Sequence, residues 1–539
     1  MGRNCDGRLR HEDRKRMTDT DPNAESSRAT WYEATRAARP DHPRLGFDLD
    51  VDVCVVGAGL AGLTAAREVA RRGWSVAVLE GGRIAEAASG RNTGFVLPGY
   101  SESIDSMVER IGLDHTKQLW ALSEQGVDYV RRTIADNDLP GVDPVPGWLR
   151  VHQTDDPDRV RAEVERLRWI GADVEMWTTD RVRAQLDSRR YFDAVHWRNA
   201  FHIHPLNYAL GLAKLAVDDG CRIFEETPAL SIDPAGVRKR IDTPNGRVRA
   251  DKVVFAGNVQ LGNLMPSLSA TLLPVTSFVM VTEPLGDKLH NYVRYKGAIS
   301  DTDRADNHYR IVDGDRLMVS GRIRVWMTDA QRFARALAGD IGRKYPGLGP
   351  VEVAHVWSGT LGRTIHRMPQ IGEMSEGVWL ASGFAGHGLN TTAVAGELVA
   401  RGIVDGDDTW RLFAPYELVW AGGRTGAAVA QGLYWWRTAM TEAARALSRQ
   451  RERRRLAKAE RLAAIAAAGP VIPPEPVPAA VLAAAPIPEA VIADAAPEGG
   501  LSEGQPERRK NRSKRRKAKA DAESSDAQDA APSPESTTP

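Results

Sequence analysis

The sequence predicts an α/β fold in which a domain with a parallel sheet is joined to a second domain with a mixed or antiparallel sheet. Residues 48–80 have the pattern of a strand, a helix and a second strand, with a glycine-rich turn after the first strand. Residues 271–325 alternate apolar and polar side chains with a period of two, which is typical of antiparallel strands. The chain has 539 residues, which is enough for about two or three ordinary domains.

The glycine-rich turn predicts a binding site for an adenine dinucleotide. The first glycine allows the tight turn, the second lets a pyrophosphate approach the backbone, and the third lets the next helix pack on the sheet. That helix, expected over Leu60–Arg72, directs its free N–H groups and the positive end of its dipole at the pyrophosphate. The predicted cradle consists of Gly57, Ala58, Gly59, Leu60, Ala61 and Gly62.

The second short strand, Ser75–Leu79, ends on Glu80. A carboxylate at the tip of this strand accepts hydrogen bonds from the ribose hydroxyls of the adenosine. It also repels a 2′-phosphate, which argues against NADP. A chain that holds an adenine dinucleotide is expected to be an enzyme rather than a scaffold.

Composition excludes several other classes. The formal net charge is +1, so the whole chain is not a polyanion binder. The three cysteines, Cys5, Cys54 and Cys221, form no CxxC pair and no Cys/His cluster, so no metal is expected. No apolar stretch reaches the ~18 residues of a membrane span, and the N-terminus resembles neither a secretory signal nor a transit peptide. We expect a cytoplasmic protein in a reducing compartment.

Further elements are expected along the chain. Helical patterns occupy 101–136, 157–170 and 207–219, and Gly220 is a stop signal. Strands are expected over 221–232, broken by Pro228, over 248–256 and over 377–383, followed by a helix over 390–401. The predicted organisation is a disordered extension (1–30), a discontinuous cofactor-binding domain (48–108, 200–265 and 365–405), a substrate domain (109–199 and 266–364), closing helices (406–440), a helical extension (441–468) and a disordered Ala/Pro-rich, basic tail (469–539).

Four motifs resemble the FAD-dependent amine and amino-acid oxidoreductases of the D-amino-acid oxidase superfamily, and most of all the γ-glutamylputrescine oxidase group. They are Trp31-Tyr-Glu-Ala-Thr35 before the first strand, Ala88-Ser-Gly-Arg-Asn-Thr-Gly94, His204-Pro-Leu-Asn-Tyr-Ala-Leu-Gly-Leu-Ala213, and Gly383-Phe-Ala-Gly-His-Gly388. The likeness covers about residues 30–440. It implies a Rossmann-like FAD-binding domain of the glutathione-reductase type, and a flavoprotein whose cofactor is FAD.

The resemblance also implies where FAD lies. The cradle residues 57–62 meet the pyrophosphate and Glu80 the adenosine ribose. Gly257, at the end of the strand 248–256, is a further expected cofactor contact. The remaining implied contacts are Ser89, Gly90, Arg91, Asn92 and Thr93 for the flavin, Pro228, Ala229 and Leu230 for the adenine, and Gly383, Phe384, Gly386, His387 and Gly388 for the pyrimidine end of the flavin ring.

Some members of this superfamily bind flavin covalently, through a cysteine before the final strand or a histidine in the early loop. The corresponding stretch here, Trp357–Pro369, contains no cysteine, and the early loop (residues 81–94) has Asn92 instead of a histidine. We therefore expect non-covalent FAD.

The oxidation of an amine by flavin requires few catalytic side chains from the protein. A hydride leaves the carbon next to a neutral amine for flavin N5, and negative charge develops near N1 and the C2 carbonyl. The turn Gly386-His-Gly388 and the helix after it are suited to stabilise that charge, although such turns also occur without a ligand. His387 is a candidate flavin donor, substrate contact or helix cap, and we do not expect a general base.

A substrate carboxylate would need an arginine, and Arg363 is the predicted catalytic-site arginine together with His387. Arg310 and Arg322 are further candidates, and for each of the three a structural ion pair or solvated position is the alternative. Candidate pocket walls, each of which is more often a core residue, are Tyr100, Trp148, Trp197, Tyr309 and Trp357.

Two segments near the C-terminus have two interpretations each. The basic block 507–519 is a solvated tail or a contact with nucleic acid or anionic lipid, and it lacks interleaved aromatic residues for base stacking. Residues 427–436 are apolar and end in Tyr434, Trp435 and Trp436; we expect them to close the catalytic domain, and contact with a membrane is the alternative.

The sequence thus predicts an FAD-dependent oxidoreductase that converts an amine or amino acid to an imine, with γ-glutamylputrescine-like compounds, N-methyl amino acids or D-amino acids as substrates. The electrons pass to O₂ or to another acceptor. Three alternatives remain open: a quinone-linked D-amino-acid dehydrogenase, a flavoenzyme that acts on modified RNA, and a flavin-binding interaction protein without catalysis.

Overall fold

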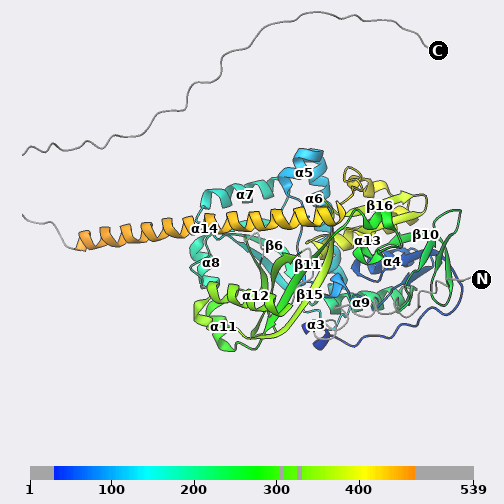
Figure 1. Ribbon diagram of the computed structural model, residues 1–539, viewed down its shortest axis with the longest axis horizontal. Coiled ribbons are helices and arrows are strands. Elements are labelled where there is room, and N and C mark those ends of the chain that lie inside the picture. The colour runs from blue at the N-terminus through cyan, green and yellow to red at the C-terminus, as the bar shows by residue number, and fades with distance from the viewer. Residues whose placement is uncertain (1–29, 303–306, 325–329, 468–539) are drawn as a thin grey trace, which may run out of the picture. The chain divides into compact units, whose positions relative to one another are not determined.

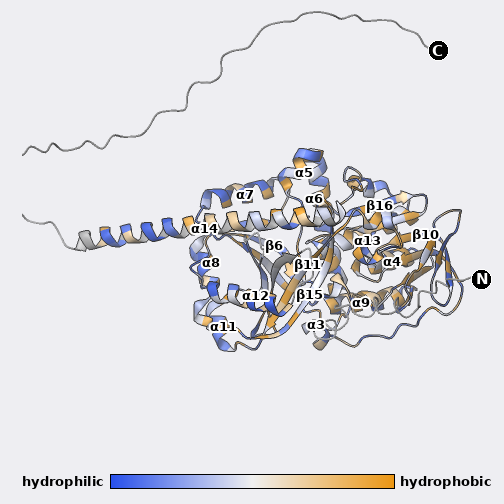
Figure 2. Ribbon diagram, in the orientation of Figure 1, coloured by the Kyte–Doolittle hydropathy of each residue, from blue (hydrophilic) through white to orange (hydrophobic). Residues whose placement is uncertain are grey.

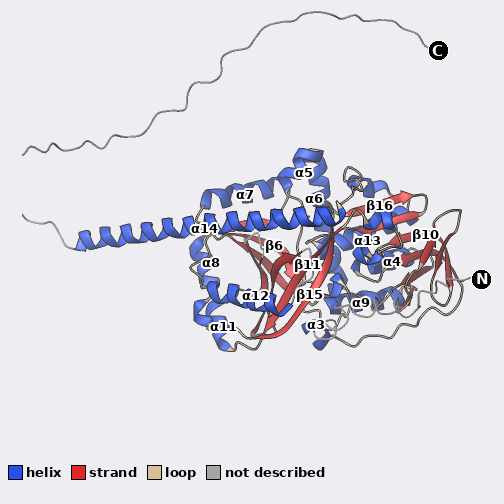
Figure 3. Cartoon of the chain, viewed as in Figure 1, coloured by secondary structure: helices blue, strands red, loops and turns tan. Residues whose placement is uncertain are grey.

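Two β-sheets organise the chain in this computed structural model, which describes residues 30–302, 307–324 and 330–467 (Figure 3). The first sheet has eight strands in the order β16-β17-β10-β1-β2-β7, with β9 paired to β10 and β8 paired to β9. Its centre, from β17 to β7, is parallel. The strands are β1 (Leu49–Val56), β2 (Val76–Leu79), β7 (Arg222–Phe224), β8 (Ser231–Asp233), β9 (Lys239–Asp242), β10 (Arg247–Phe255), β16 (Gln370–Ser375) and β17 (Val378–Ser382).

The second sheet has nine strands in the order β15-β11-β14-β13-β12-β4-β6-β3, with β5 paired to β6. Its pairs are antiparallel apart from β12 and β4, which run parallel. The strands are β3 (Phe95–Val96), β4 (Val145–Val151), β5 (Val174–Trp177), β6 (Ala194–His202), β11 (Leu273–Thr282), β12 (Ala298–Asp301), β13 (His308–Val312), β14 (Arg316–Arg324) and β15 (Val353–Arg363).

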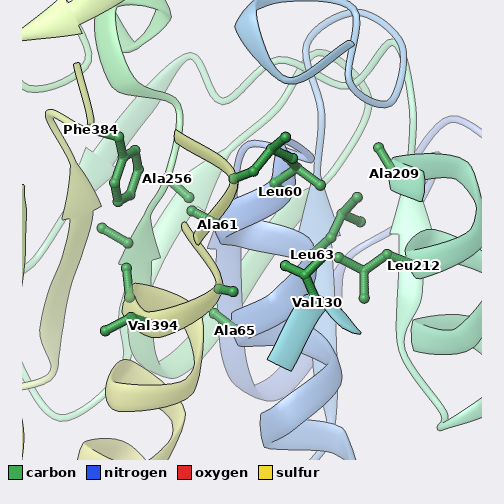
Figure 4. Close-up of a cluster of buried hydrophobic side chains, with 14 of the residues drawn as sticks. Leu60, Ala61, Leu63, Ala65, Val130, Ala209, Leu212, Ala256, Phe384 and Val394 are labelled. Carbon is green, nitrogen blue, oxygen red and sulfur yellow. The ribbon is translucent and has the colours of Figure 1, made fainter. Parts of the chain in front are cut away.

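Helix α4 is the centre of the core beside the first sheet. All of its side chains are buried, and α6, α9 and α13 contribute to the same apolar cluster. Figure 4 shows Leu63 of α4 facing Val130 of α6 and Leu212 of α9. The α-helices (Figure 1) are α3 (Trp31–Ala34), α4 (Leu60–Ala70), α5 (Ile104–Ile111), α6 (Leu113–Ala135), α7 (Pro157–Trp169), α8 (Thr179–Gln185), α9 (Pro205–Asp218), α10 (Pro266–Ser269), α11 (Asp287–Tyr292), α12 (Ala330–Lys344), α13 (Gly388–Val404) and α14 (Gly423–Ala467).

Both faces of the second sheet are buried. Met318 and Trp357 belong to the apolar cluster that contains α4, whereas Tyr309 and Val319 belong to a separate cluster with α12. Successive side chains of a strand point to opposite faces. Arg310, which pairs with Met318 across β13 and β14, therefore lies on the face toward the first sheet.

The predicted fold class, a parallel cofactor-binding sheet with a second mixed sheet, is confirmed. The predicted strand–helix–strand unit corresponds to β1, α4 and β2. The stretch 271–325 forms β11 to β14, but α11 interrupts it and β12 pairs in parallel with β4. The helical patterns over 101–136 and 157–170 correspond to α5, α6 and α7, whereas β4, β5 and β6 were not predicted.

The strand predicted over 221–232 is interrupted around Pro228, as expected, but over a longer stretch than predicted. Strand β7 ends at Phe224, and β8 begins only at Ser231. Glu226 has φ +48°, and the N–H of Thr227 donates to the carbonyl of Glu80 at 2.7 Å. Pro228 has no N–H to donate to a ladder. The chain therefore turns across the end of β2 instead of extending along it.

The C-terminal helix begins earlier than expected. Residues 406–440 contain a short 3₁₀ helix, Asp408–Phe413, and the first turns of α14, which starts at Gly423 and continues to Ala467. The predicted disordered segments, 1–30 apart from its last residue and 469–539, lie outside the described residues. Within the described ranges, no helix has both the length and the hydropathy that crossing a bilayer requires.

Candidate flavin site

The carboxyl ends of β1, β10 and β17 meet at the predicted pyrophosphate cradle. Gly57, directly after β1, has φ +109°, and a Cβ there would lie 2.9 Å from the carbonyl carbon of Ala256, directly after β10. A Cβ on Gly62 would overlap the carbonyl oxygen of Gly57. The glycines thus allow strand ends and helix start to approach more closely than any side chain would permit.

The N-terminus of α4 is built to receive an anion. Its N-cap is Gly59, which has no side chain to cap the helix, and no acidic residue lies in the first turn. The hydroxyl of Ser89, from the early loop, accepts the N–H of Leu60 at 3.0 Å. A Cβ on Gly59 would lie 2.9 Å from that hydroxyl. The free backbone and the helix dipole together favour a bound phosphate.

Glu80 lies at the end of β2, beside the cradle. Its carboxylate accepts the N–H of Ala58 at 2.7 Å and that of Gly82 at 2.9 Å. Burial raises the pKa of Glu80 above its ordinary value. The predicted adenine contacts, residues 228–230, lie close by, since a Cβ on Gly81 would be 3.6 Å from that of Pro228. The structure thus brings the predicted ribose and adenine residues to one edge.

The side chains of the early loop are engaged within the protein. Asn92 donates to the carbonyls of Ala88 and Ser89, and its side-chain oxygen accepts the N–H of Gly94 at 2.8 Å. Buried Arg91 donates to the carbonyl of Glu86 at 2.8 Å and to that of Ser358 at 3.1 Å. These bonds fold the loop and fasten it to β15. That the loop's residues 89–93 contact flavin stays a prediction.

The C-terminal motif joins the two sheets at the start of α13. Phe384 forms an isolated bridge with Arg363, and the N–H of Ala385 donates to the carbonyl of Gly362 at 3.1 Å. The N-cap His387 makes no capping bond, and the first turn of α13 has no acidic residue. This helix end is therefore also suited to negative charge.

His387 is neutral at physiological pH. Burial and the nearby Arg150 cation lower its pKa to about 4, and the ring bonds to the carbonyl of Pro98. Its Nδ1 has no partner among the described residues. The bonded ring atom is therefore the Nε2–H donor, which leaves Nδ1 as an unused acceptor inside the site.

His308, on β13, is a second neutral imidazole, and it lies close enough to His387 and Arg150 for their charges to affect its pKa. The Ser300 hydroxyl accepts the indole N–H of Trp148 at 2.8 Å and lies 2.7 Å from His308 Nδ1. Burial, and then the charges of His387, Lys344 and Arg150, lower the pKa of His308 to about 4. His308 has the same strand direction as Arg310, two residues on, so both face the first sheet.

Arg310 is 5% exposed, and its guanidinium bonds to neutral groups. One terminal nitrogen lies 2.7 Å from His202 Nδ1 and the other donates to the Tyr32 hydroxyl at 3.2 Å. Tyr32 in turn donates to the carbonyl of Asn92 at 2.7 Å, which links the arginine to the early loop. Of the other candidates, Arg363 ends β15 beside Phe384, and the side chain of Arg322 lies outside the described residues.

The five candidate pocket aromatics are buried. Tyr100 donates to the carbonyl of Leu119 at 2.7 Å, Trp357 donates to that of Arg91 at 3.0 Å, and Trp148 stacks on Trp197. Tyr309 lies in a chain of hydroxyls with Tyr191 and Tyr345 on the α12 side of the sheet. Their described contacts are those of core residues, which was the alternative.

Several residues of this site were not identified from the sequence. They come from strands far apart in the chain, and only the alternation of His308 and Arg310 on one strand signalled a shared face. The missed residues are Tyr32, Arg150, His202, Ser300 and His308. Within the part of the chain that the structure describes, no three His, Cys, Asp or Glu residues are grouped to hold a metal.

Acid should destabilise the network around Arg310 through His202. Burial, and then the Arg310 charge, lower the pKa of His202 from 6.5 to about 3. The stabilisation of the neutral imidazole is present above pH 6.5 and is lost as the pH falls. As the pH falls from about 6 to about 4, the free energy of unfolding should decrease in wild type more steeply than in His202→Gln. The difference between the two slopes should be about 1.4 kcal/mol per pH unit. Denaturant titrations at several pH values measure this, with exposed His290→Gln as control; equal slopes would contradict it.

The residues fit FAD. The N-cap residues of α4 and α13 make no side-chain capping bond, and neither first turn is acidic. Together with the glycine cradle that a Cβ would fill and the unpaired Nδ1 of His387, these helix ends suit an anionic dinucleotide with hydrogen-bonding ring edges.

Comparisons with known proteins agree with this fit. A family profile described as "FAD dependent oxidoreductase" (DAO) matches residues 52–401. "Probable oxidoreductase OrdL" of Haemophilus influenzae is 30% identical over 71% of this chain and 90% of its own length. Gamma-glutamylputrescine oxidoreductase of Escherichia coli is 30% identical over 74% of this chain and 94% of its own.

Solved structures show the same fold. Glycine oxidase from Geobacillus kaustophilus matches with a TM-score of 0.59 at 20% sequence identity, covering 69% of this chain and 99% of that one. The structural likeness establishes only the fold. The family profile and the two relatives also identify the family, because they match most of the chain, the relatives at 30% sequence identity. The chain therefore belongs to the DAO family of FAD-dependent oxidoreductases, and its cofactor is FAD.

Proposed function

We propose that this enzyme oxidises the C–N bond of a carboxylate-bearing amine to an imine, which water then hydrolyses. The observation that carries the proposal is the wall of the second sheet that faces the flavin site, where His308 and Arg310 lie with Arg150 close by. Arg150 is ion-paired with Glu163 at 2.8 Å, so the two neutral imidazoles and the Arg310 guanidinium are the groups that suit a substrate with a carboxylate and a deprotonated amine. γ-Glutamylputrescine-like compounds, N-methyl amino acids and D-amino acids all have this chemistry.

The residues that would hold FAD are those expected from the sequence: the cradle 57–62, Glu80, the loop 89–93, residues 228–230, Gly257 and the motif 383–388. FAD bound there supplies the acceptor for the hydride that leaves the carbon next to the substrate nitrogen. The protein's own contribution is electrostatic. The N-terminus of α13 stabilises negative charge that develops at the flavin pyrimidine, without reorganising during the reaction.

His387 and Arg363 are the proposed catalytic-site residues. With a pKa of about 4, His387 carries no proton on Nδ1 at neutral pH, so this atom accepts a hydrogen bond from a ligand N–H. Arg363 lies beside Phe384 of the flavin motif and is proposed as a clamp for the substrate carboxylate. Arg310 is the second candidate for that clamp, and the variants Arg310→Met and Arg363→Met distinguish the two.

Anaerobic flavin reduction tests the proposal. Purified holoenzyme is mixed with polyamines, γ-glutamylated amines, N-methyl amino acids, D-amino acids and 2-hydroxy acids, and the visible flavin absorbance is followed. We expect carboxylate-bearing amines to bleach the flavin. Bleaching by hydroxy acids alone, or by none of the compounds, would overturn the proposal. Oxygen consumption against reduction of an artificial dye then identifies O₂ or another acceptor.

Gly388→Ala should weaken FAD binding without unfolding the protein. A Cβ on Gly388, the first residue of α13, meets no protein atom within 4 Å, so only a ligand at this helix end would be displaced. We expect an FAD dissociation constant raised about tenfold or more, for a cost of ~1.4 kcal/mol or more, and an unchanged apoprotein melting temperature. Gly342→Ala on α12, also open within 4 Å, is the matched control. Equal affinities would remove the flavin from this end of α13.

Denaturation should release all the flavin. Cys54 and Cys221 are buried, and burial raises the pKa of each thiol to about 12, so neither provides a thiolate for a flavin linkage. After acid precipitation we expect the yellow colour in the supernatant. Cys5 lies outside the described residues, so Cys5→Ser is the control. Flavin that pellets with the polypeptide of both proteins would contradict non-covalent binding.

A further inference from the structure

An apolar stripe runs along the outward face of α14. Its members, 49–61% exposed, are Val429, Leu433, Trp436, Met440 and Leu447. At 3.6 residues per turn, their spacing places them within a sector of about 60°. Gln431, which lies about 170° from the middle of that sector, is 1% exposed. Near its start the helix therefore contacts the protein through the side opposite the stripe, and no partner for the stripe is seen among the described residues.

The same face becomes basic beyond Leu447. Exposed Arg451, Arg454, Lys458 and Arg461 continue the sector of the stripe. The helix as a whole has ten Arg and Lys residues and three Glu residues, a net charge of +7 in a chain whose total is +1. By helical spacing each glutamate position lies about 130° or more from the middle of the stripe; they are Glu442, Glu452 and Glu460.

Figure 2 shows this change of character along α14, from mixed apolar residues near Gly423 to a largely hydrophilic second half. The second half extends away from the other helices and strands (Figure 1). Exposed aromatic residues gather at the other end: Trp420 before the helix and Trp436 within the stripe are each more than 60% exposed. Apolar side chains gathered on one exposed surface mark an interaction site.

The charges decide between possible partners. A second copy of α14 paired in parallel along the stripe would bring the four cations of one helix near those of the other, and a copy paired antiparallel would leave the cations of both helices without an acidic partner on that face. The phosphates of a nucleic acid would pair with the four cations but would leave the apolar stripe exposed to water. An anionic bilayer satisfies both halves, because tryptophan and aliphatic side chains enter the boundary between headgroups and acyl chains while Arg and Lys bind lipid phosphates.

We propose that α14 binds the surface of an anionic membrane, with the stripe inserted at that boundary and its axis in the plane of the bilayer. The contact is peripheral, and it goes beyond the proposed oxidation and does not depend on it. An enzyme held in this way is positioned to take substrate from, or deliver electrons to, molecules dissolved in the membrane.

Two pairs of adjacent residues test the proposal in the full-length holoenzyme. Trp436→Ala and Arg454→Glu change the stripe face, whereas Trp435→Ala and Arg453→Glu make the same changes on a neighbouring face. Each variant is sedimented with vesicles of phosphatidylcholine and phosphatidylglycerol, or of phosphatidylcholine alone. The basic block 507–519 is present in every variant, so the difference within each pair reports α14.

We expect wild type to sediment with the anionic vesicles, less so in high salt, and not with the neutral ones. Trp436→Ala and Arg454→Glu should each lower the partition coefficient at least about fivefold relative to their neighbours. Flavin absorbance and melting temperature report that the variants are folded. Equal partition within both pairs would overturn the proposal. So would a dimer in light scattering that Trp436→Ala dissociates while vesicles bind nothing, which would assign the stripe to a second copy.

Discussion

A Gly62→Ala variant should be isolated without FAD and with a much lower melting temperature. The new Cβ would overlap the carbonyl oxygen of Gly57 and lie 3.2 Å from the Cβ of Ala256. Helix α4 has no room to retreat, because every one of its side chains is buried and a Cβ on Gly396 of α13 would already lie 2.5 Å from Thr64. Overpacking of such a core costs about 1–3 kcal/mol or more.

The loss of FAD follows from the same displacement. Any shift of α4 that relieves the overlap also moves the N–H groups that would meet the pyrophosphate. Visible absorbance of the purified protein and thermal unfolding measure the two effects. Gly46→Ala is the matched control, since a Cβ at Gly46 meets nothing within 4 Å. A Gly62→Ala protein that keeps both FAD and wild-type stability would show that the cradle lies elsewhere.

The part of the site around Gly62 was predictable from the sequence because it is local. Gly57, Gly62 and Glu80 lie within one strand–helix–strand unit, so their spacing along the chain fixes their spacing in space. Even there, the partners of Arg91 and Asn92 were not predicted. Their side chains bond to backbone carbonyls of the protein, and which carbonyl a loop arginine reaches depends on the approach of β15, more than 250 residues further on.

The opposite wall was not predictable, because it depends on strand register. Ser300, His308 and Arg150 meet through the pairing of β12 with β13 and with β4. The parallel pair β12–β4 joins segments about 150 residues apart, and a one-residue slip would turn each side chain to the other face. The same pairing buries Tyr309 on the α12 side, although its neighbours His308 and Arg310 face the first sheet.

Arg310→Met should raise KM for carboxylate-bearing amines by about 30-fold to several thousand-fold, the equivalent of about 2–5 kcal/mol. Arg310 is 5% exposed, and its guanidinium is bonded to neutral His202 and Tyr32 and has an Nε without a partner among the described residues. Burying a cation among neutral groups costs desolvation free energy, and a substrate carboxylate that binds the cation offsets part of that cost. The KM of amines without a carboxylate should therefore change little in Arg310→Met.

The difference between the two amine classes separates this role from a structural one. Methionine fills the space without a charge but leaves the buried His202 Nδ1 without its donor, at a cost of about 1–3 kcal/mol. We therefore expect a fall of that size in the free energy of unfolding of Arg310→Met, together with a KM rise that is confined to carboxylate-bearing amines. A fall in stability with KM equal for both amine classes would make Arg310 a structural residue. Arg363→Met is the companion variant. If only Arg363→Met raises KM for carboxylate-bearing amines more than for other amines, the carboxylate binds Arg363, the arginine predicted from the sequence, beside Phe384.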